Sequence, residues 1–180
     1  MLSSPARRIL PALVAYLVLA FGAAAQEMAT GEPATGMLPL VSRWLHVFGA
    51  IFLLGGAFYL RAAVMPAAAE VLDADTHAKL RAGITARWRK YVHILIAALL
   101  ITGLYNFMAV TRFQHDGQSA YHMLFGIKFL LAIAIFGLAS MLAGKKAISQ
   151  KLQEKAALWV GVTIVLGAAT VMIAGYMKMM

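Results

Sequence analysis

The chain contains no cysteine, and only 13% of its residues are charged. Without thiols it has no disulfide, no thiolate metal site, no iron–sulfur cluster and no covalently attached haem. Soluble domains are about 25% charged. The low charge, a hydrophobic content of 62% and a mean hydropathy of +0.79 therefore predict a membrane protein.

Acidic side chains are also absent from the four long apolar runs of the sequence. These runs cover about residues 40–60, 91–110, 121–143 and 156–176. Each is long enough to cross a bilayer as a helix, which needs about 20 apolar residues. The absence of a carboxylate from every span argues against a hydrolase or a carboxylate-driven proton pump. Redox chemistry would have to come from a bound cofactor.

Basic residues lie mostly between the spans and predict how the protein is oriented. Six fall within residues 61–90 and four lysines within 144–155, whereas Arg43, Arg112 and Lys178 are on the opposite side. The positive-inside rule makes 61–90 and 144–155 inner segments. The first should be a loop with a short amphipathic helix, in which His77 is solvated. The net charge of +9 thus predicts orientation in a lipid bilayer and not nucleic-acid binding.

The N-terminal 25 residues have the pattern of a cleavable signal peptide. Arg7 and Arg8 precede an apolar stretch over 9–22, and three alanines end the segment. The alternative is an uncleaved N-terminal anchor helix. We therefore predict an all-α, integral membrane, up-down four-helix bundle over residues 26–180. It would lie in a bacterial inner membrane, with the mature N- and C-termini on the outer, periplasmic side.

Polar side chains inside the spans gather in the predicted outer half of the bundle. Such a layer is the usual form of a cofactor, ion or substrate site in a bundle, although hydrogen bonds between helices are the simpler interpretation for some members. The members are His46, Thr102, Tyr105, Asn106, His122, Lys128 and Thr170. Thr102, Tyr105, Asn106 and Thr170 are expected to join helices. His46 and Lys128 are expected to have a function, because a buried ammonium is costly in a membrane.

Histidine and methionine on the predicted outer side suggest copper. Thioethers favour Cu(I), and in an oxidising compartment Met and His would replace Cys as ligands. The candidate metal ligands are His46, His122 and Met123. An imidazole such as that of His46 is equally suited to a haem iron.

Three sequence signatures resemble known membrane families. They are Trp44-Leu45-His46 followed by Gly55-Gly56, the helix ending Thr102-Gly103-Leu104-Tyr105-Asn106, and Tyr121 followed after six residues by Lys128. This order is similar to the copper-resistance D (CopD) family and to the HemJ family of membrane protoporphyrinogen oxidases. The resemblance implies functional positions at His46 and Lys128, with Tyr121 and Asn106 as further cofactor-binding candidates.

The sequence therefore leaves three functions open. The first is a CopD-like protein that binds or passes copper at a His/Met/Lys layer, with a periplasmic metal carrier or a larger membrane complex as its partner. The second is a membrane redox protein with haem b, in which His46 is the axial ligand and Lys128 pairs with a propionate. The third is a structural subunit of a larger membrane complex.

Overall fold

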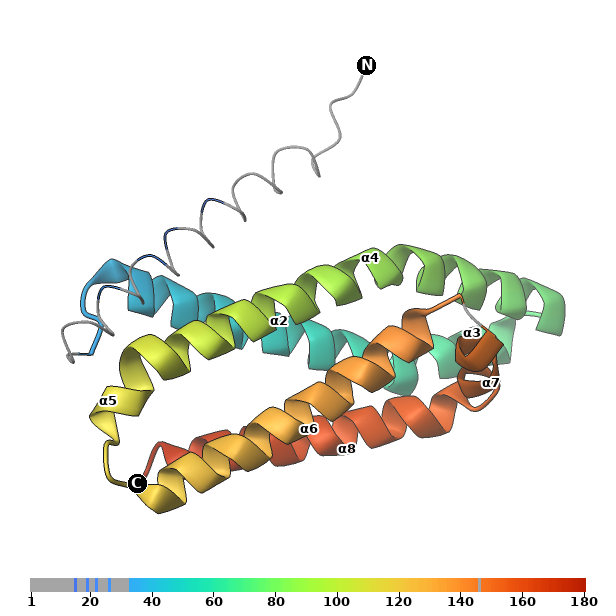
Figure 1. The fold of residues 1–180 in the computed structure, drawn as a ribbon. Helices are drawn as coiled ribbons and strands as arrows, with labels where there is room; N and C mark the ends of the chain where they lie inside the picture. The colour runs from blue at the N-terminus through green and yellow to red at the C-terminus, as the bar shows by residue number, and fades with distance from the viewer. Residues whose placement is uncertain (1–14, 16–18, 20–21, 23–25, 27–32, 146) are drawn as a thin grey trace. The chain divides into compact units, whose positions relative to one another are not determined.

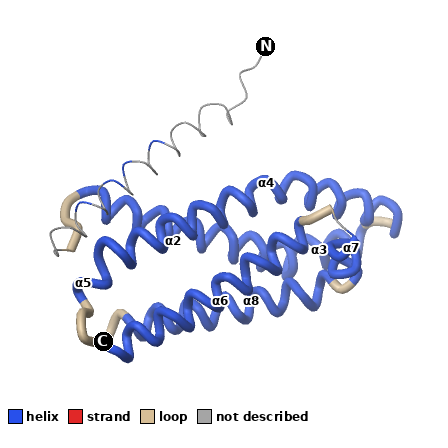
Figure 2. Tube along the Cα trace, in the orientation of Figure 1, coloured by secondary structure: helices blue, strands red, loops and turns tan. Residues whose placement is uncertain are grey.

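The structure is a computed structural model that describes residues 33–145 and 147–180, together with the isolated positions 15, 19, 22 and 26. Every regular element in this part of the chain is a helix, and it contains no strand (Figure 2). The all-α prediction is confirmed. The predicted signal peptide, residues 1–25, lies outside the described residues apart from positions 15, 19 and 22.

Four helical segments are long and apolar enough to cross a membrane. They are Met37–Val71, Ala74–Gln114, Ser119–Ala143 and Ala156–Met177. Many of their large apolar side chains are exposed, for example those of Phe52, Leu130 and Met172. Lipid would cover such surfaces, and in lipid a helix satisfies its own backbone hydrogen bonds. The chain is consistent with a multi-pass membrane protein.

The first two segments are built from several consecutive helices. Met37–Val71 consists of α2 (Met37–Tyr59), the π-helix η1 (Leu60–Val64) and α3 (Met65–Val71). Ala74–Gln114 consists of α4 (Ala74–Asn106), the π-helix η2 (Phe107–Thr111) and α5 (Arg112–Gln114). Pro66, in the first turn of α3, has no N–H to donate to the preceding turn, which is formed by the π-helix η1.

The other two segments are single helices joined by a short one. They are α6 (Ser119–Ala143) and α8 (Ala156–Met177), with α7 (Ala147–Glu154) between them. Gly117, with φ of +75°, forms the turn before α6, where a residue with a Cβ would be strained.

The prediction of a loop over residues 61–90 is wrong. Only Leu72 and Asp73 interrupt the helices there, and α4 begins at Ala74 and continues through the basic residues into the second span. Charged side chains do not end a helix, because their charged groups reach solvent while the backbone stays hydrogen-bonded. His77 is consequently a helical residue and not part of a loop.

The chain divides into two compact units. Unit 1 contains, of the described residues, the positions 15, 19, 22 and 26 and the ranges 33–47 and Ala98–Gly117. Its core consists of Ala34, Tyr105, Ala109 and Val110, with Leu38 packed against them. The backbone N–H of Ala34 donates to the carbonyl of Ala109 at 2.7 Å, which fixes the segment before α2 against η2.

Unit 2 contains Phe48–Ala97 and Gln118–Met180. Within it α6 and α8 lie side by side and antiparallel, and α7 contacts both (Figure 1). The amide of Gln153 on α7 donates to the carbonyls of Leu142 and Gly144 at 2.8 and 3.0 Å. This interaction closes the end of α6.

Candidate functional site

His46 is held by a chain of hydrogen bonds inside unit 1. Its Nδ1 lies 3.0 Å from Thr102 Oγ1, and that hydroxyl lies 2.6 Å from the carbonyl oxygen of Ala98. A carbonyl cannot donate, so the single hydroxyl proton of Thr102 belongs to the Ala98 contact. Thr102 Oγ1 is then the acceptor for Nδ1–H of His46. In the neutral imidazole, Nε2 is then the nitrogen without a proton.

Close packing restricts the position of the same imidazole. His46 and Ser42 are one turn apart on α2, and Ser42, which is fully buried, has its hydroxyl 3.5 Å from the carbonyl of Thr102. A Cβ added at Gly103 would lie only 2.8 Å from His46 Cε1. Thr102 orients the ring, and Gly103 leaves room for it.

Tyr105 and Asn106, the other polar candidates on α4, have positions that the fold itself explains. Tyr105 is 5% exposed and belongs to the core of unit 1. Asn106 is half-buried at the end of α4, and its carbonyl accepts a hydrogen bond from Thr111 Oγ1 at 3.0 Å. Of the three polar positions predicted on this helix, Thr102 is the one with a hydrogen bond to His46.

The predicted site residues of α6 all belong to unit 2. Tyr121 is buried, and its ring meets the His122 ring edge-on at a centroid distance of 6.1 Å. Lys128 is half-buried within an apolar helix. Asp75 and Lys79 form the only ion pair among residues 33–145 and 147–180, so Lys128 has no carboxylate partner there. That Lys128 and His46 belong to one polar layer stays a prediction.

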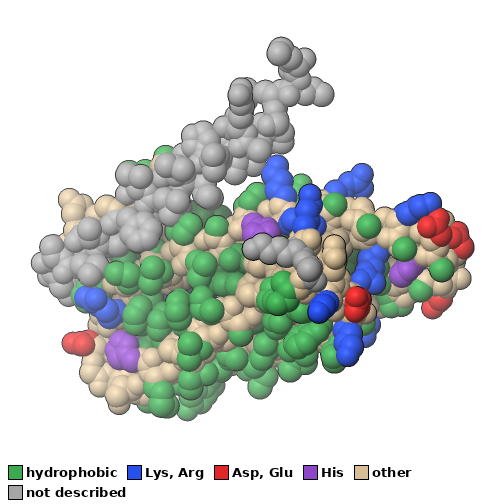
Figure 3. Space-filling view, turned by 45° about the vertical axis from the view of Figure 1, so that its right-hand side comes forward, with side chains coloured by type: hydrophobic (Ala, Val, Ile, Leu, Met, Phe, Trp, Pro, Cys, Tyr) green, Lys and Arg blue, Asp and Glu red, His purple; other side chains and the backbone are tan. Residues whose placement is uncertain are grey.

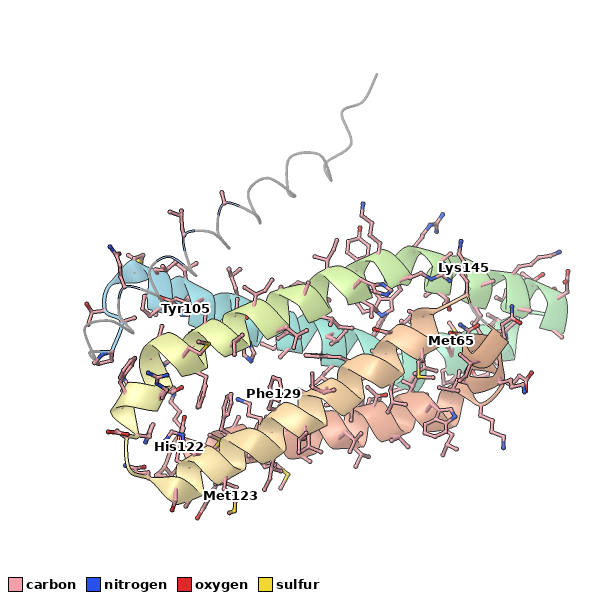
Figure 4. All side chains as sticks on the ribbon, viewed as in Figure 1. Met65, Tyr105, His122, Met123, Phe129 and Lys145 are labelled. Atoms are coloured by element: carbon pink, nitrogen blue, oxygen red, sulfur yellow. The ribbon has the colours of Figure 1, made fainter. Side chains whose placement is uncertain are left out.

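His122 and Met123 are consecutive on α6 and differ in their surroundings (Figure 4). The His122 side chain is half-buried, whereas Met123 is 63% exposed. Neighbouring helical residues project about 100° apart. These two side chains therefore do not converge on one ion. Within the described part of the chain, no three His, Asp or Glu side chains are grouped so that they could hold a metal.

Thr170 does not join two helices. Its hydroxyl donates to the carbonyl of Leu166, one turn earlier in α8, at 2.9 Å. The expectation of an interhelical bond is wrong here, because a threonine in a helix can satisfy its hydroxyl on its own backbone.

A cavity of about 410 Å³ in unit 2 was not predicted from the sequence. Arg61, His77 and Arg81 line it, together with apolar residues of α2, α4, α6 and α8. Part of its wall comes from the segment 61–90, for which the sequence predicted a loop. The signal was the spacing of His77, Arg81, Thr85, Trp88 and Val92, which places them on one face of a helix once α4 is extended to Ala74.

Comparison with family models, with curated proteins and with solved structures found no match to the chain.

Proposed function

We propose that this protein is a bacterial inner-membrane redox protein that binds haem b, with His46 Nε2 as an axial ligand. The observation that carries the proposal is the hydrogen bond between His46 Nδ1 and Thr102 Oγ1. Histidines that bind metals almost always donate their other ring N–H to a neighbouring acceptor, which fixes the tautomer and increases the basicity of the ligating nitrogen.

The residues present fit this group. Haem iron in proteins needs only one axial imidazole from the chain, and His46 offers one with a fixed orientation. When bound, haem b would supply one-electron redox chemistry, which the side chains of the spans do not supply. The chain's own contribution is to hold the imidazole, through Thr102 and Gly103, and to keep its proton on Nδ1.

The proposal includes the membrane arrangement predicted from the sequence. The four spans would form an up-down bundle, residues 1–25 would be a signal peptide or an anchor helix, and the mature termini would lie on the outer side. The four apolar helices and the basic segments between them support this arrangement.

Copper binding is the second candidate. Unit 1 contains the thioethers of Met37 and Met108 as well as His46, and soft sulfur ligands favour Cu(I). The ligand set His46, His122 and Met123 is less favourable, because His122 and Met123 leave α6 in different directions. The oriented imidazole of His46 is common to both candidates.

Absorption spectra of the purified protein test the proposal. The wild-type chain should show a Soret band that His46→Ala abolishes. His77→Ala should leave the band unchanged, because His77 lines the separate cavity of unit 2. Copper content, measured on the same samples, should be independent of the His46 substitution.

Equal Soret bands in His46→Ala and in the wild type would refute the haem proposal. A colourless wild-type protein holding one copper ion per chain, lost in His46→Ala, would establish the copper candidate instead. A protein with neither haem nor copper would leave the structural-subunit hypothesis.

A further inference from the structure

The cavity of unit 2 lies where the helix ends meet on the predicted inner side. Its walls include Arg61 of η1, the first half of α4, the end of α6 and the start of α8. Met65, at the start of α3, is also part of its wall (Figure 4). Figure 3 shows Lys and Arg side chains at this end of unit 2, beside hydrophobic side chains and a few Asp and Glu side chains.

Two guanidinium groups line the cavity without an acidic partner. Arg61 Nε donates to the carbonyl of Ala157 at 3.1 Å, and Arg81 donates to the carbonyl of Gln153. These bonds hold both side chains at the cavity but do not neutralise their charge. No acidic residue of the described chain lines the cavity, and neither arginine has an ion pair there. The cavity therefore favours an anion.

His77 adds an unsatisfied polar atom to the same wall. Its Nε2 is buried and has no hydrogen-bond partner among the described residues. Leaving a buried polar nitrogen unbonded costs free energy. Gln153 and Thr163, in contrast, are already bonded to backbone carbonyls, and Thr85 adds a further hydroxyl to the wall. A ligand with hydrogen-bonding oxygens would satisfy His77.

The rest of the lining is apolar. Leu60, Trp88, Val92, Leu142 and Val160 belong to it. A small hydrophilic anion would not contact these side chains and would leave the apolar part of the cavity empty. An amphiphile with an anionic head and an aliphatic chain satisfies both parts of the wall.

We propose that this cavity binds an anionic membrane phospholipid, with its phosphate at Arg61, His77 and Arg81 and part of one acyl chain against the apolar wall. Basic pockets between membrane helices on the cytoplasmic side are suited to acidic lipid head groups. Arginine binds phosphate through paired N–H groups. This inference does not depend on the haem or copper proposed for His46.

The test uses the full chain in nanodiscs and in detergent. Native mass spectrometry should detect retained phosphatidylglycerol in preference to phosphatidylcholine. The double variant Arg61→Gln/Arg81→Gln should bind phosphatidylglycerol about tenfold more weakly, because two charge-assisted interactions are lost. Glutamine keeps an N–H donor for the two backbone carbonyls.

Arg87→Gln is the matched control, since Arg87 is an exposed residue of α4 that does not line the cavity. It should bind phosphatidylglycerol like the wild type. Equal retention in the double variant and in Arg87→Gln would overturn the proposal, and so would equal retention of the two lipids by the wild type.

Two further measurements distinguish a bound phospholipid from a soluble anion. Ala139→Phe should weaken lipid retention by filling the apolar part of the cavity without changing its charge. Unchanged retention in that variant would overturn the acyl-chain contact, even if the double variant fails to fold. Titration of inorganic phosphate into phosphatidylcholine nanodiscs should show no arginine-dependent binding, and such binding would assign the site to a soluble phosphate instead.

Discussion

Thr102 determines which nitrogen of His46 carries the proton. The threonine hydroxyl donates to Ala98 and accepts from Nδ1, so the imidazole is fixed both in orientation and in tautomer. Thr102 is 2% exposed, and no bulk water competes for this bond. In a low-dielectric environment such a hydrogen bond is stronger than in water, and its loss costs more.

Thr102→Val should weaken the binding of the proposed haem to His46. The substitution keeps the shape of the side chain but removes the acceptor for Nδ1–H. Loss of a hydrogen-bond partner of a ligating histidine typically lowers metal affinity about 10- to 100-fold. The measurement is the dissociation constant for haem, or for copper if copper is the ligand, by spectroscopic titration.

Thr170→Val is the matched control for this experiment. The Thr170 hydroxyl donates to the carbonyl of Leu166 in its own helix, so its removal should leave the affinity unchanged. Thr102→Ser should retain most of the affinity, because the hydroxyl is kept. Equal affinities of Thr102→Val and Thr170→Val would contradict the orienting role.

At the scale of elements, one glycine of α2 lets Trp88 of α4 approach closely in unit 2. A Cβ at Gly56 would lie 2.6 Å from Trp88 Cη2, whereas a Cβ at the neighbouring Gly55 would meet nothing within 4 Å. The indole ring is rigid and cannot bend away. Gly56 therefore lets α4 approach, as small residues do between membrane helices.

Gly56→Ala should destabilise the protein, and Gly55→Ala should not. The first forces Trp88 or the helices to move, at a cost of about 1–3 kcal/mol. The second adds helix propensity, which is worth up to about 1 kcal/mol. Unfolding in mixed detergent micelles measures both. An equal loss of stability in the two variants would mean that the approach of Trp88 is not the limiting contact.

Asp73 caps the start of α4 and makes that end sensitive to acid. Its Oδ1 accepts hydrogen bonds from the backbone N–H of Thr76 at 2.9 Å and of Asp75 at 3.1 Å. The backbone hydrogen bond from Thr76 is the main cause that holds the pKa of Asp73 below its ordinary value. A lowered pKa means that folding favours the charged form.

The sign of the pH dependence follows from that shift. The contribution of the cap is fully present above the ordinary aspartate pKa of about 4 and is lost as the pH falls through the lowered value. Hydrogen exchange of the Thr76 amide should therefore accelerate, relative to the intrinsic rate, at the acidic end. Asp73→Ala should accelerate it where the carboxylate is charged and should remove this pH dependence. Asp75→Asn, which removes only the exposed pair with Lys79, should have little effect.

The sequence predicted best the helices that consist of one long apolar run. The runs that became α6 and α8 contain one charged residue between them, Lys128. A continuous apolar run of this length satisfies its own backbone hydrogen bonds in lipid by forming a helix. The segment 61–90 was misjudged because its basic residues suggested a loop, although they are compatible with a helix that leaves the membrane.

The candidate sites were predictable to different degrees. His46 stands out because an imidazole is unusual in a membrane span, but its bond to Thr102 depends on how α2 and α4 align, which no local pattern fixes. The cavity of unit 2 was missed because it combines four segments distant in sequence. His77 could be recognised only after α4 was known to include it.

At the scale of the whole molecule, the basic residues are distributed unevenly between the two predicted sides of the membrane. The predicted inner segments carry ten basic residues, which attract anionic lipids of the inner leaflet. The proposed lipid site uses Arg61 and Arg81 from these segments. His46 follows Arg43 at the start of the first span, on the predicted outer side. The lipid proposal therefore requires the orientation in which the segment 61–90 faces the inner leaflet.

That orientation can be tested directly, because the chain contains no cysteine and single cysteines can be introduced without a background. Ser119, at the start of α6, and Gln150, on α7, are both exposed. A membrane-impermeant maleimide should label Ser119→Cys in intact cells and Gln150→Cys only after permeabilisation. The reason is that the basic segments resist transfer across the membrane. The unmodified chain should label in neither state, and the reverse pattern for the two cysteines would place Arg61 and Arg81 on the outer side, away from the leaflet that attracts them.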